Sequence, residues 1–182
     1  MAQTACPQLK NFLASDNCLE NLAGLGSSLY YFAKKDLQAK LTLTGNTFST
    51  PSFASGAGLY KIDAKEQTVQ LTGGSLKKRG GFKQELKFTI QANNAQTAEL
   101  NRALNNHEIG FIVVDNDVSY IVYDPIYNGA FDADGISADT GAAATDDRQV
   151  TYTYLLQPCL YDKHLCVEPA EGGWDSLMVQ EN

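Results

Sequence analysis

The segment that most constrains the fold is residues 82–92, because its hydrophobicity alternates with a period of two. The apolar residues of one face are Phe82, Leu86, Phe88, Ile90 and Ala92. The polar residues of the other face are Lys83, Glu85, Lys87, Thr89 and Gln91. Such alternation is typical of a β-strand with one face in a core and the other toward water or a neighbouring molecule. The chain must therefore build a sheet around this strand.

Further short β-type runs lie on both sides of that segment. Before it, the predicted strands are 29–37, 39–44, 47–53, 58–64 and 67–72, separated by Gly45-Asn46, Ser55-Gly56 and Gly73-Gly74. Glycine pairs of this kind favour tight turns, so we expect successive hairpins. After it, apolar runs at 109–114 and 118–123 flank an Asp115-Asn116-Asp117 turn, and 150–155 alternates Val and Tyr with Thr.

Helical patterns occur in two places. Asn94 is a suitable N-cap for a helix over about 95–105, whose apolar stripe contains Leu100, Ala103 and Leu104. Residues 7–24 predict a second helical segment that starts near Pro7. The Gly-, Ala- and Asp-rich residues 126–148 predict a long surface loop, and the residues from 158 onward predict an irregular extension.

Together these patterns predict one mainly β domain with one or two helices (α+β). The expected architecture is an antiparallel β-sandwich or barrel flanked by a helix. We expect an N-terminal helical arm over 1–28, the β domain over 29–158 and a C-terminal extension over 159–182. At 182 residues with 43% hydrophobic residues, the chain can bury a substantial core but has little room for a second domain.

Net charge and hydropathy exclude several functions. A formal charge of −7 disfavours a protein that binds nucleic acid by neutralising phosphates. No run reaches the ~18 apolar residues of a membrane helix, and no secretory signal is recognisable, so we expect neither a membrane partner nor export. Reduced thiols are then the default state of Cys6, Cys18, Cys159 and Cys166, although the even number permits disulfides.

No catalytic constellation is recognisable. The chain has only two histidines, His107 and His164, and His107 fits a role at the end of the predicted helix. Nucleotide-binding loops and nucleophile elbows have no counterpart in the sequence. We therefore expect no enzyme activity and no cofactor.

Neither of two candidate metal sites is predicted. Asp132, Asp134 and Asp139 cluster near Gly135, but an EF-hand register would place Ala130 and Gly141 at anchoring ligand positions. Cys159, His164 and Cys166 lie close in sequence, with Cys6 or Cys18 as a possible fourth zinc ligand. The C-x-x-C spacing that makes a zinc prediction strong is absent.

The single basic run, Lys77-Lys78-Arg79, is followed by two glycines and lies between two predicted strands. It is either a solvated hairpin tip or an arm that meets an acidic patch on an adjacent copy. The acidic residues Asp115, Asp117, Asp132, Asp134 and Asp139 are candidates to face a pore or a subunit boundary.

The predicted elements follow a characteristic order: strand 82–92, helix 95–105, then strands 109–114 and 118–123, with residues 141–148 leading into strand 150–155. This order resembles that of the major tail tube proteins of tailed bacteriophages. It is also similar to structural proteins from phages and prophages of Bacteroides-type bacteria. The resemblance covers about residues 58–158. It implies a virion protein, assembled in the host cytoplasm, whose hexameric rings stack into a tube.

Three features agree with this implication. An acidic lumen would repel passing DNA, so DNA would be cargo and no bound ligand. Hairpins and a long loop exceed what a compact domain needs, and ring formation would cover sheet edges. Other virion proteins would be further partners. The alternatives are another virion component (a neck, head-completion or capsid-decoration protein) or a non-viral β-sandwich binding module such as an adhesin.

Overall fold

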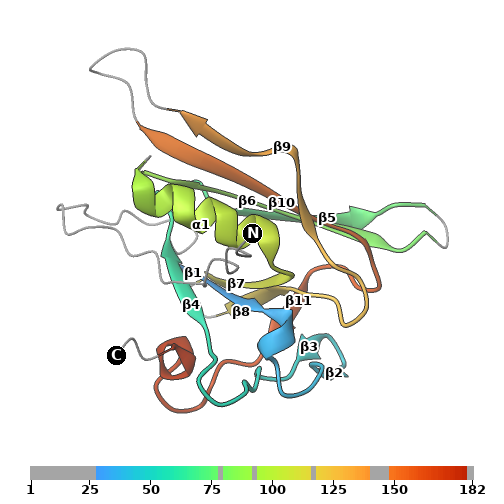
Figure 1. Cartoon of the computed structure of the whole chain (residues 1–182). Helices are drawn as coiled ribbons and strands as arrows, with labels where there is room; N and C mark the ends of the chain where they lie inside the picture. Colours follow the sequence, from blue (N-terminus) through green and yellow to red (C-terminus); the bar gives the residue numbers. More distant parts are fainter. Residues whose placement is uncertain (1–27, 78–79, 92–93, 116–117, 140–147, 180–182) are drawn as a thin grey trace, which may run out of the picture.

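The computed structural model describes residues 28–77, 80–91, 94–115, 118–139 and 148–179 (Figure 1). Within them the protein is mainly β, with two sheets and one α-helix. The seven-stranded sheet has the order β2 (Leu43–Thr44), β3 (Thr47–Phe48), β11 (His164–Cys166), β8 (Val118–Val122), β7 (Ile109–Asp115), β1 (Ser28–Ala33) and β4 (Tyr60–Asp63). The four-stranded sheet has the order β5 (Gln70–Ser75), β6 (Phe82–Ile90), β10 (Gln149–Cys159) and β9 (Ala130–Asp139).

The main core lies between the two sheets. The predicted alternation is confirmed for Leu86, Phe88 and Ile90, which are buried, and for Lys87, which is exposed, whereas Thr89 of the predicted polar face is buried. Phe88 stacks on Tyr152 of β10, with ring centroids 4.7 Å apart. Phe88 also contacts Phe111 of β7, with centroids 6.0 Å apart. These aromatic contacts join the four-stranded sheet to the seven-stranded sheet through β7.

Helix α1 (Ala95–Asn106) adds its apolar stripe to the same core. The Asn94 side chain accepts hydrogen bonds from the backbone N–H groups of Gln96 and Thr97, and the Thr97 hydroxyl accepts one from Asn94 N–H in return. This reciprocal capping fixes the start of the helix. Leu100, Ala103 and Leu104 are buried as predicted. The predicted helix and its N-cap are confirmed.

The prediction of a surface loop over 126–148 is wrong for residues 130–139, which form strand β9. This segment has a weak intrinsic preference for strand, but β10 offers a long edge on which its backbone can pair. The pairing is interrupted: Ile136 lies opposite Tyr152 and Phe131 opposite Tyr154, so residues 132–135 face Thr153 alone. Such a bulge bends the strand.

Several expected hairpins take another form. The Gly45-Asn46 turn is confirmed, but its strands are only Leu43–Thr44 and Thr47–Phe48. Gly73 and Gly74 lie inside β5 and do not form a turn. The strands β4 and β5 belong to different sheets, and so do β6 and β7. The strands around α1 therefore connect two sheets and do not extend a single one. Neither sheet closes into a barrel within the described residues.

The prediction that the chain from residue 158 onward is irregular is also wrong. Strand β10 continues to Cys159, and β11 inserts between β3 and β8 in the seven-stranded sheet. The short 3-10 helix η2 (Trp174–Leu177) follows, and Trp174 is 2% exposed. Its indole N–H donates to the Ser119 hydroxyl across 2.8 Å. A second core on the outer face of the seven-stranded sheet contains Trp174 with Tyr30 and Phe32 of β1.

The predicted N-terminal helical arm lies outside the described residues, apart from Ser28, which opens β1. A further 3-10 helix, η1 (Lys34–Asp36), follows that strand. Among the described residues, no helix combines the length and the apolarity that crossing a membrane requires.

We expect Trp174→Ala to lower the free energy of unfolding by about 3–5 kcal/mol, because it removes a buried aromatic ring from the second core. Urea unfolding followed by circular dichroism measures this change. Ile126→Ala is the matched control: its side chain is 62% exposed, so it should change stability by less than about 0.5 kcal/mol. Equal stabilities of the two variants would mean that the C-terminal segment does not stabilise the domain.

Candidate assembly surfaces

The hairpin that joins β5 to β6 projects from the body (Figure 1). Leu76 N–H donates to Gly81 O at 3.0 Å, and Gly80 N–H donates to Lys77 O at 2.7 Å, so the end of the hairpin is a hydrogen-bonded turn. Leu76 is 37% exposed and Lys77 is exposed beside it. The structure thus places Lys77 at the predicted basic tip. Lys78 and Arg79 lie outside the described residues.

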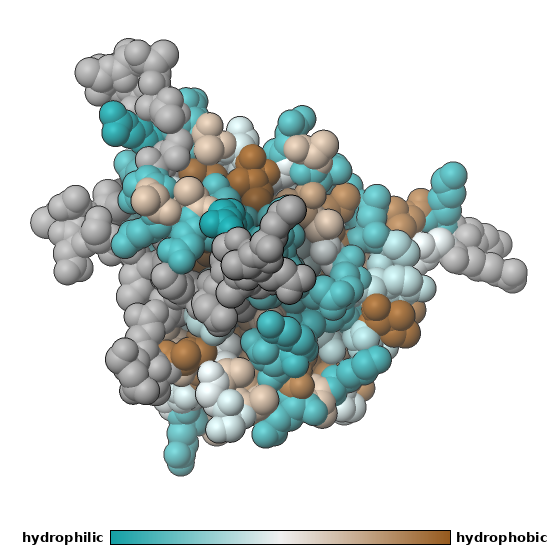
Figure 2. Space-filling model, in the orientation of Figure 1, coloured by the Kyte–Doolittle hydropathy of each residue, from teal (hydrophilic) through white to brown (hydrophobic). Residues whose placement is uncertain are grey.

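A buried carboxylate fixes an apolar surface near the base of this hairpin. Asp124, 1% exposed, accepts hydrogen bonds from the backbone N–H groups of Ile126 (2.8 Å), Tyr127 (2.9 Å) and Leu160 (2.7 Å). The side chains of these three residues are 62%, 40% and 41% exposed, respectively. We call them the Asp124 platform. Figure 2 shows hydrophobic surface on this side of the molecule, below the projecting hairpin.

Lys34 also holds the platform in place, through the backbone after Ile126. Lys34 Nζ donates to Tyr127 O at 2.8 Å and to Asn128 Oδ1. The same ammonium group lies 5.5 Å from the centroid of the Tyr123 ring. Burial lowers the pKa of Lys34, an effect that nearby Glu108 and Asp124 oppose. Large apolar side chains are thus exposed on a loop whose backbone is held in place by hydrogen bonds. Exposed apolar patches of this kind are common at interaction surfaces.

Sequence reasoning missed this platform. The available signal was Asp124-Pro125, a pair that favours a turn, followed immediately by two large apolar residues. Leu160 gave no signal, since only the fold brings it to Asp124.

The acidic candidates do not form one site. Asp132 and Asp134 are exposed on the bulge of β9, and Asp139 is exposed at the end of that strand. A side chain at Gly135 would come within 2.6 Å of the Asp132 nitrogen, so the bulge requires glycine there. Placing these aspartates on a loop was therefore wrong. Because β9 is a bent edge strand that carries exposed carboxylates, it is a poor template for pairing with a strand of another molecule.

Asp115 is the last residue of β7 and pairs with Val118 across the turn, while Asp117 lies outside the described residues. This turn is in a different sheet from β9. Groups of three or more His, Cys, Asp or Glu side chains that could hold a metal ion are absent from the described part of the chain.

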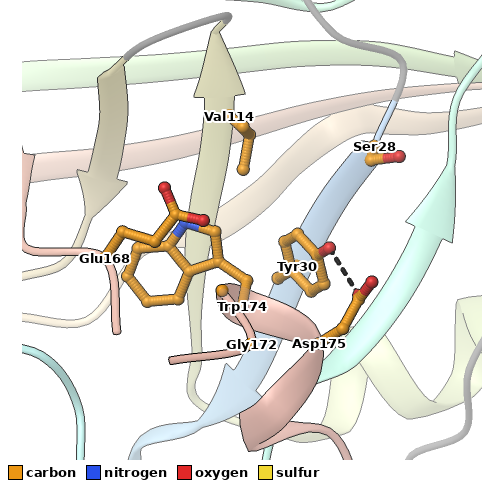
Figure 3. Close-up of a pocket in the computed structure, with 8 residues that line it drawn as sticks. Ser28, Tyr30, Val114, Glu168, Gly172, Trp174 and Asp175 are labelled. Atoms are coloured by element: carbon orange, nitrogen blue, oxygen red, sulfur yellow. Dashed lines mark hydrogen bonds between the residues drawn. The ribbon is translucent and has the colours of Figure 1, made fainter. Parts of the chain in front are cut away.

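A pocket of about 330 Å³ lies where the start of β1 meets the C-terminal segment (Figure 3). It is lined by Ser28, Tyr30, Val114, Glu168, Gly172, Gly173, Trp174 and Asp175. The rings of Tyr30 and Trp174 form its apolar part, with centroids 6.5 Å apart. The carboxylates of Glu168 and Asp175 supply its charge. We call this site the aromatic-acidic pocket.

The pocket has a negative potential. Tyr30 Oη donates to Asp175 Oδ1 at 2.7 Å. Burial, this hydrogen bond and the charges of Asp175, Glu168 and Asp63 all raise the pKa of Tyr30 above its ordinary value. The Nζ of Lys61 lies 5.8 Å from the Tyr30 ring centroid. The phenol therefore stays protonated and keeps its hydrogen bond to Asp175.

The two described cysteines do not pair with each other. Cys159 lies in the core between the sheets, whereas Cys166 lies in the second core. Burial raises the pKa of Cys159 to about 11 and that of Cys166 to about 12. His164 Nδ1 contacts the Asp162 carbonyl, and its ring packs against Phe48 and Tyr161. Cys6 and Cys18 lie outside the described residues, and His107 is the C-cap of α1.

Comparisons with known proteins give no further assignment: no family model, no curated protein and no solved structure matches the chain.

We expect Asp124→Asn to lower the free energy of unfolding by about 1–3 kcal/mol, because the amide cannot accept from Leu160 N–H while it accepts from Ile126 and Tyr127. Chemical denaturation measures the loss. Asp132→Asn, at an exposed position of β9, serves as the control and should leave stability unchanged. A destabilisation of equal size in the control would contradict the role of Asp124.

Thiol labelling tests the burial of the cysteines. In a Cys6→Ser, Cys18→Ser variant at pH 8, we expect Ellman's reagent to react at least about a hundredfold more slowly with native protein than with urea-unfolded protein. The reason is that a raised pKa leaves little reactive thiolate, and burial blocks access. Labelling should accelerate as the pH rises toward 11. Rapid labelling of native protein at pH 8 would show that these thiols are accessible.

Proposed function

We propose that the protein is a virion structural protein, a self-assembling subunit of a phage tail tube. The observation that carries this proposal is the β5–β6 hairpin, which projects from the body and exposes both Leu76 and Lys77. An ordered projection with an apolar and a cationic side chain has no partner on its own described surface that would explain its length. A second copy would supply that partner.

The Asp124 platform supports self-association independently. Three large apolar side chains are exposed near the base of the hairpin and are held rigidly from both sides. Burying them in a contact would release water from apolar surface without an entropy cost for ordering the loop. The net charge of −7 fits a tube through which DNA passes without adhering. Rings of six copies, stacking and contacts with other virion proteins are part of this proposal through the resemblance alone.

A second candidate is a different virion component, such as a neck, head-completion or capsid-decoration protein. The same hairpin and platform would then contact another virion protein in place of an identical copy. The bent, acidic edge strand β9 is compatible with either function. In both proposals the subunits meet through side-chain contacts of the hairpin and the platform, and no continuous sheet between subunits is needed.

Assembly can be tested on the purified full chain. We expect rings or hollow cylinders in negative-stain electron micrographs at high concentration, and large species in analytical ultracentrifugation. The triple variant Lys77→Glu, Lys78→Glu, Arg79→Glu should remain folded by circular dichroism but assemble at least about fivefold more weakly, because reversed charge at the tip repels an acidic partner surface.

The matched control is Arg102→Glu, which reverses an exposed cation of helix α1, outside both the hairpin and the platform, and should assemble like the original chain. Strictly monomeric protein at all concentrations would refute the tail tube proposal and favour the second candidate. Assembly of the triple variant at the original strength would remove the hairpin from the contact.

A further inference from the structure

The aromatic-acidic pocket has the chemistry of a site for an organic cation. Carboxylates form charge-assisted hydrogen bonds with ammonium and guanidinium groups, and the apolar stem of a lysine or arginine packs against hydrophobic surface. Here the margins of the buried Tyr30 and Trp174 rings, 6% and 2% exposed, border the same space as the exposed carboxylates of Glu168 and Asp175. A volume of about 330 Å³ lies at the small end of the range for ligand sites, so it suits one extended side chain.

The wall of the pocket is already ordered. Tyr30 Oη donates a hydrogen bond to Asp175 Oδ1, and Trp174 Nε1 donates one to Ser119 Oγ. Both rings are therefore fixed before any ligand binds. Glu168 makes no hydrogen bond or ion pair to another described residue, and its carboxylate borders the opening together with Gly173. A side chain at Gly173 would come within 2.8 Å of Glu168 Oε1, so glycine keeps this side open.

A matching cation, Lys77, lies on the opposite side of the same molecule, at the tip of the β5–β6 hairpin. In Figure 1 the β5–β6 hairpin projects to the right, whereas η2, which supplies Trp174 and Asp175 to the pocket, lies at the lower left. A molecule cannot therefore place its own Lys77 in its own pocket. Exposed apolar residues accompany both sites: Leu76 and the Asp124 platform at the hairpin end, and Val118 (38% exposed) and Val167 (49% exposed) at the pocket end.

We infer that the aromatic-acidic pocket of one copy receives the Lys77 side chain at the hairpin tip of the next copy. This inference rests on the proposed self-assembly and names the contact that would mediate it. The contact joins two different surfaces, so repeating it gives a closed ring or an open filament and not a two-fold dimer. The ammonium group would lie between Glu168 and Asp175 at the mouth of the pocket, and the aliphatic stem of Lys77 would pack against the margins of the Trp174 and Tyr30 rings.

Trp174 is the only tryptophan of the chain, so its fluorescence reports on the pocket directly. The probe is a synthetic peptide with the sequence of residues 74–82, titrated into full-length protein that carries Lys77→Glu, Lys78→Glu and Arg79→Glu. We expect a saturable change in the Trp174 emission. Glu168→Gln should weaken the apparent affinity about fivefold, the upper range for an exposed ion pair, and added salt should weaken it further.

Two controls define the outcome of the titration. A peptide in which the three basic residues are glutamine should give no saturable signal, and Asp132→Asn protein should bind like the parent. The absence of a saturable change with the basic peptide, or equal binding of both peptides, overturns the assignment of the pocket.

A charge exchange tests the contact in the assembled state. Lys77→Glu and Glu168→Lys should each weaken assembly, and the double variant should recover a substantial part of it, because the ion pair is restored in the reverse sense. If the original chain assembles but the double variant shows no recovery, the pocket contact is wrong and self-assembly still stands. If the original chain does not assemble, the proposed function fails, and the peptide titration still decides what the pocket binds.

Discussion

The aromatic layer between the two sheets is the constraint on which the remaining structure depends. Phe88 of β6 stacks on Tyr152 of β10 and touches Phe111 of β7, while Tyr154 packs edge-on against Phe111 at 4.9 Å. The Tyr154 hydroxyl donates to Ile109 O at 2.7 Å, so even the polar end of this buried ring is satisfied. Because these strands are fixed to each other, the hairpin that extends β6 and the end of β7 that borders the pocket at Val114 are held at a fixed separation.

Local periodicity predicted the parts of the fold that local interactions determine. The alternation around Phe88 and the Asn94 cap lie within a few residues of the contacts that they specify, and both are confirmed. Strand β9 and strand β11 could not be predicted in this way. Their residues have little preference for strand, and they pair because β10 and β8 present open edges that come from distant parts of the chain.

The candidate surfaces follow the same division. The exposed position of Lys77 was predictable, since a basic run beside glycines between two strands falls on a turn. The Asp124 platform depends on Leu160 arriving 36 residues later in the chain, and the aromatic-acidic pocket depends on Tyr30 and Asp175, which are 145 residues apart. Contacts at such separations arise from the order of strands in the sheet, and that order was not readable from spacing. A strand order with β11 inside the seven-stranded sheet is what carries the C-terminal segment to Tyr30.

The separation of Cys159 and Cys166 into opposite cores has a consequence for the environments that the folded domain can tolerate. Neither core relies on a covalent link between these sulfur atoms, and both thiols are shielded from small oxidants by surrounding apolar side chains. As far as these two residues are concerned, the fold should be indifferent to redox potential. It could form in a glutathione-rich compartment and then persist in aerated medium without sulfenic acid formation at either site.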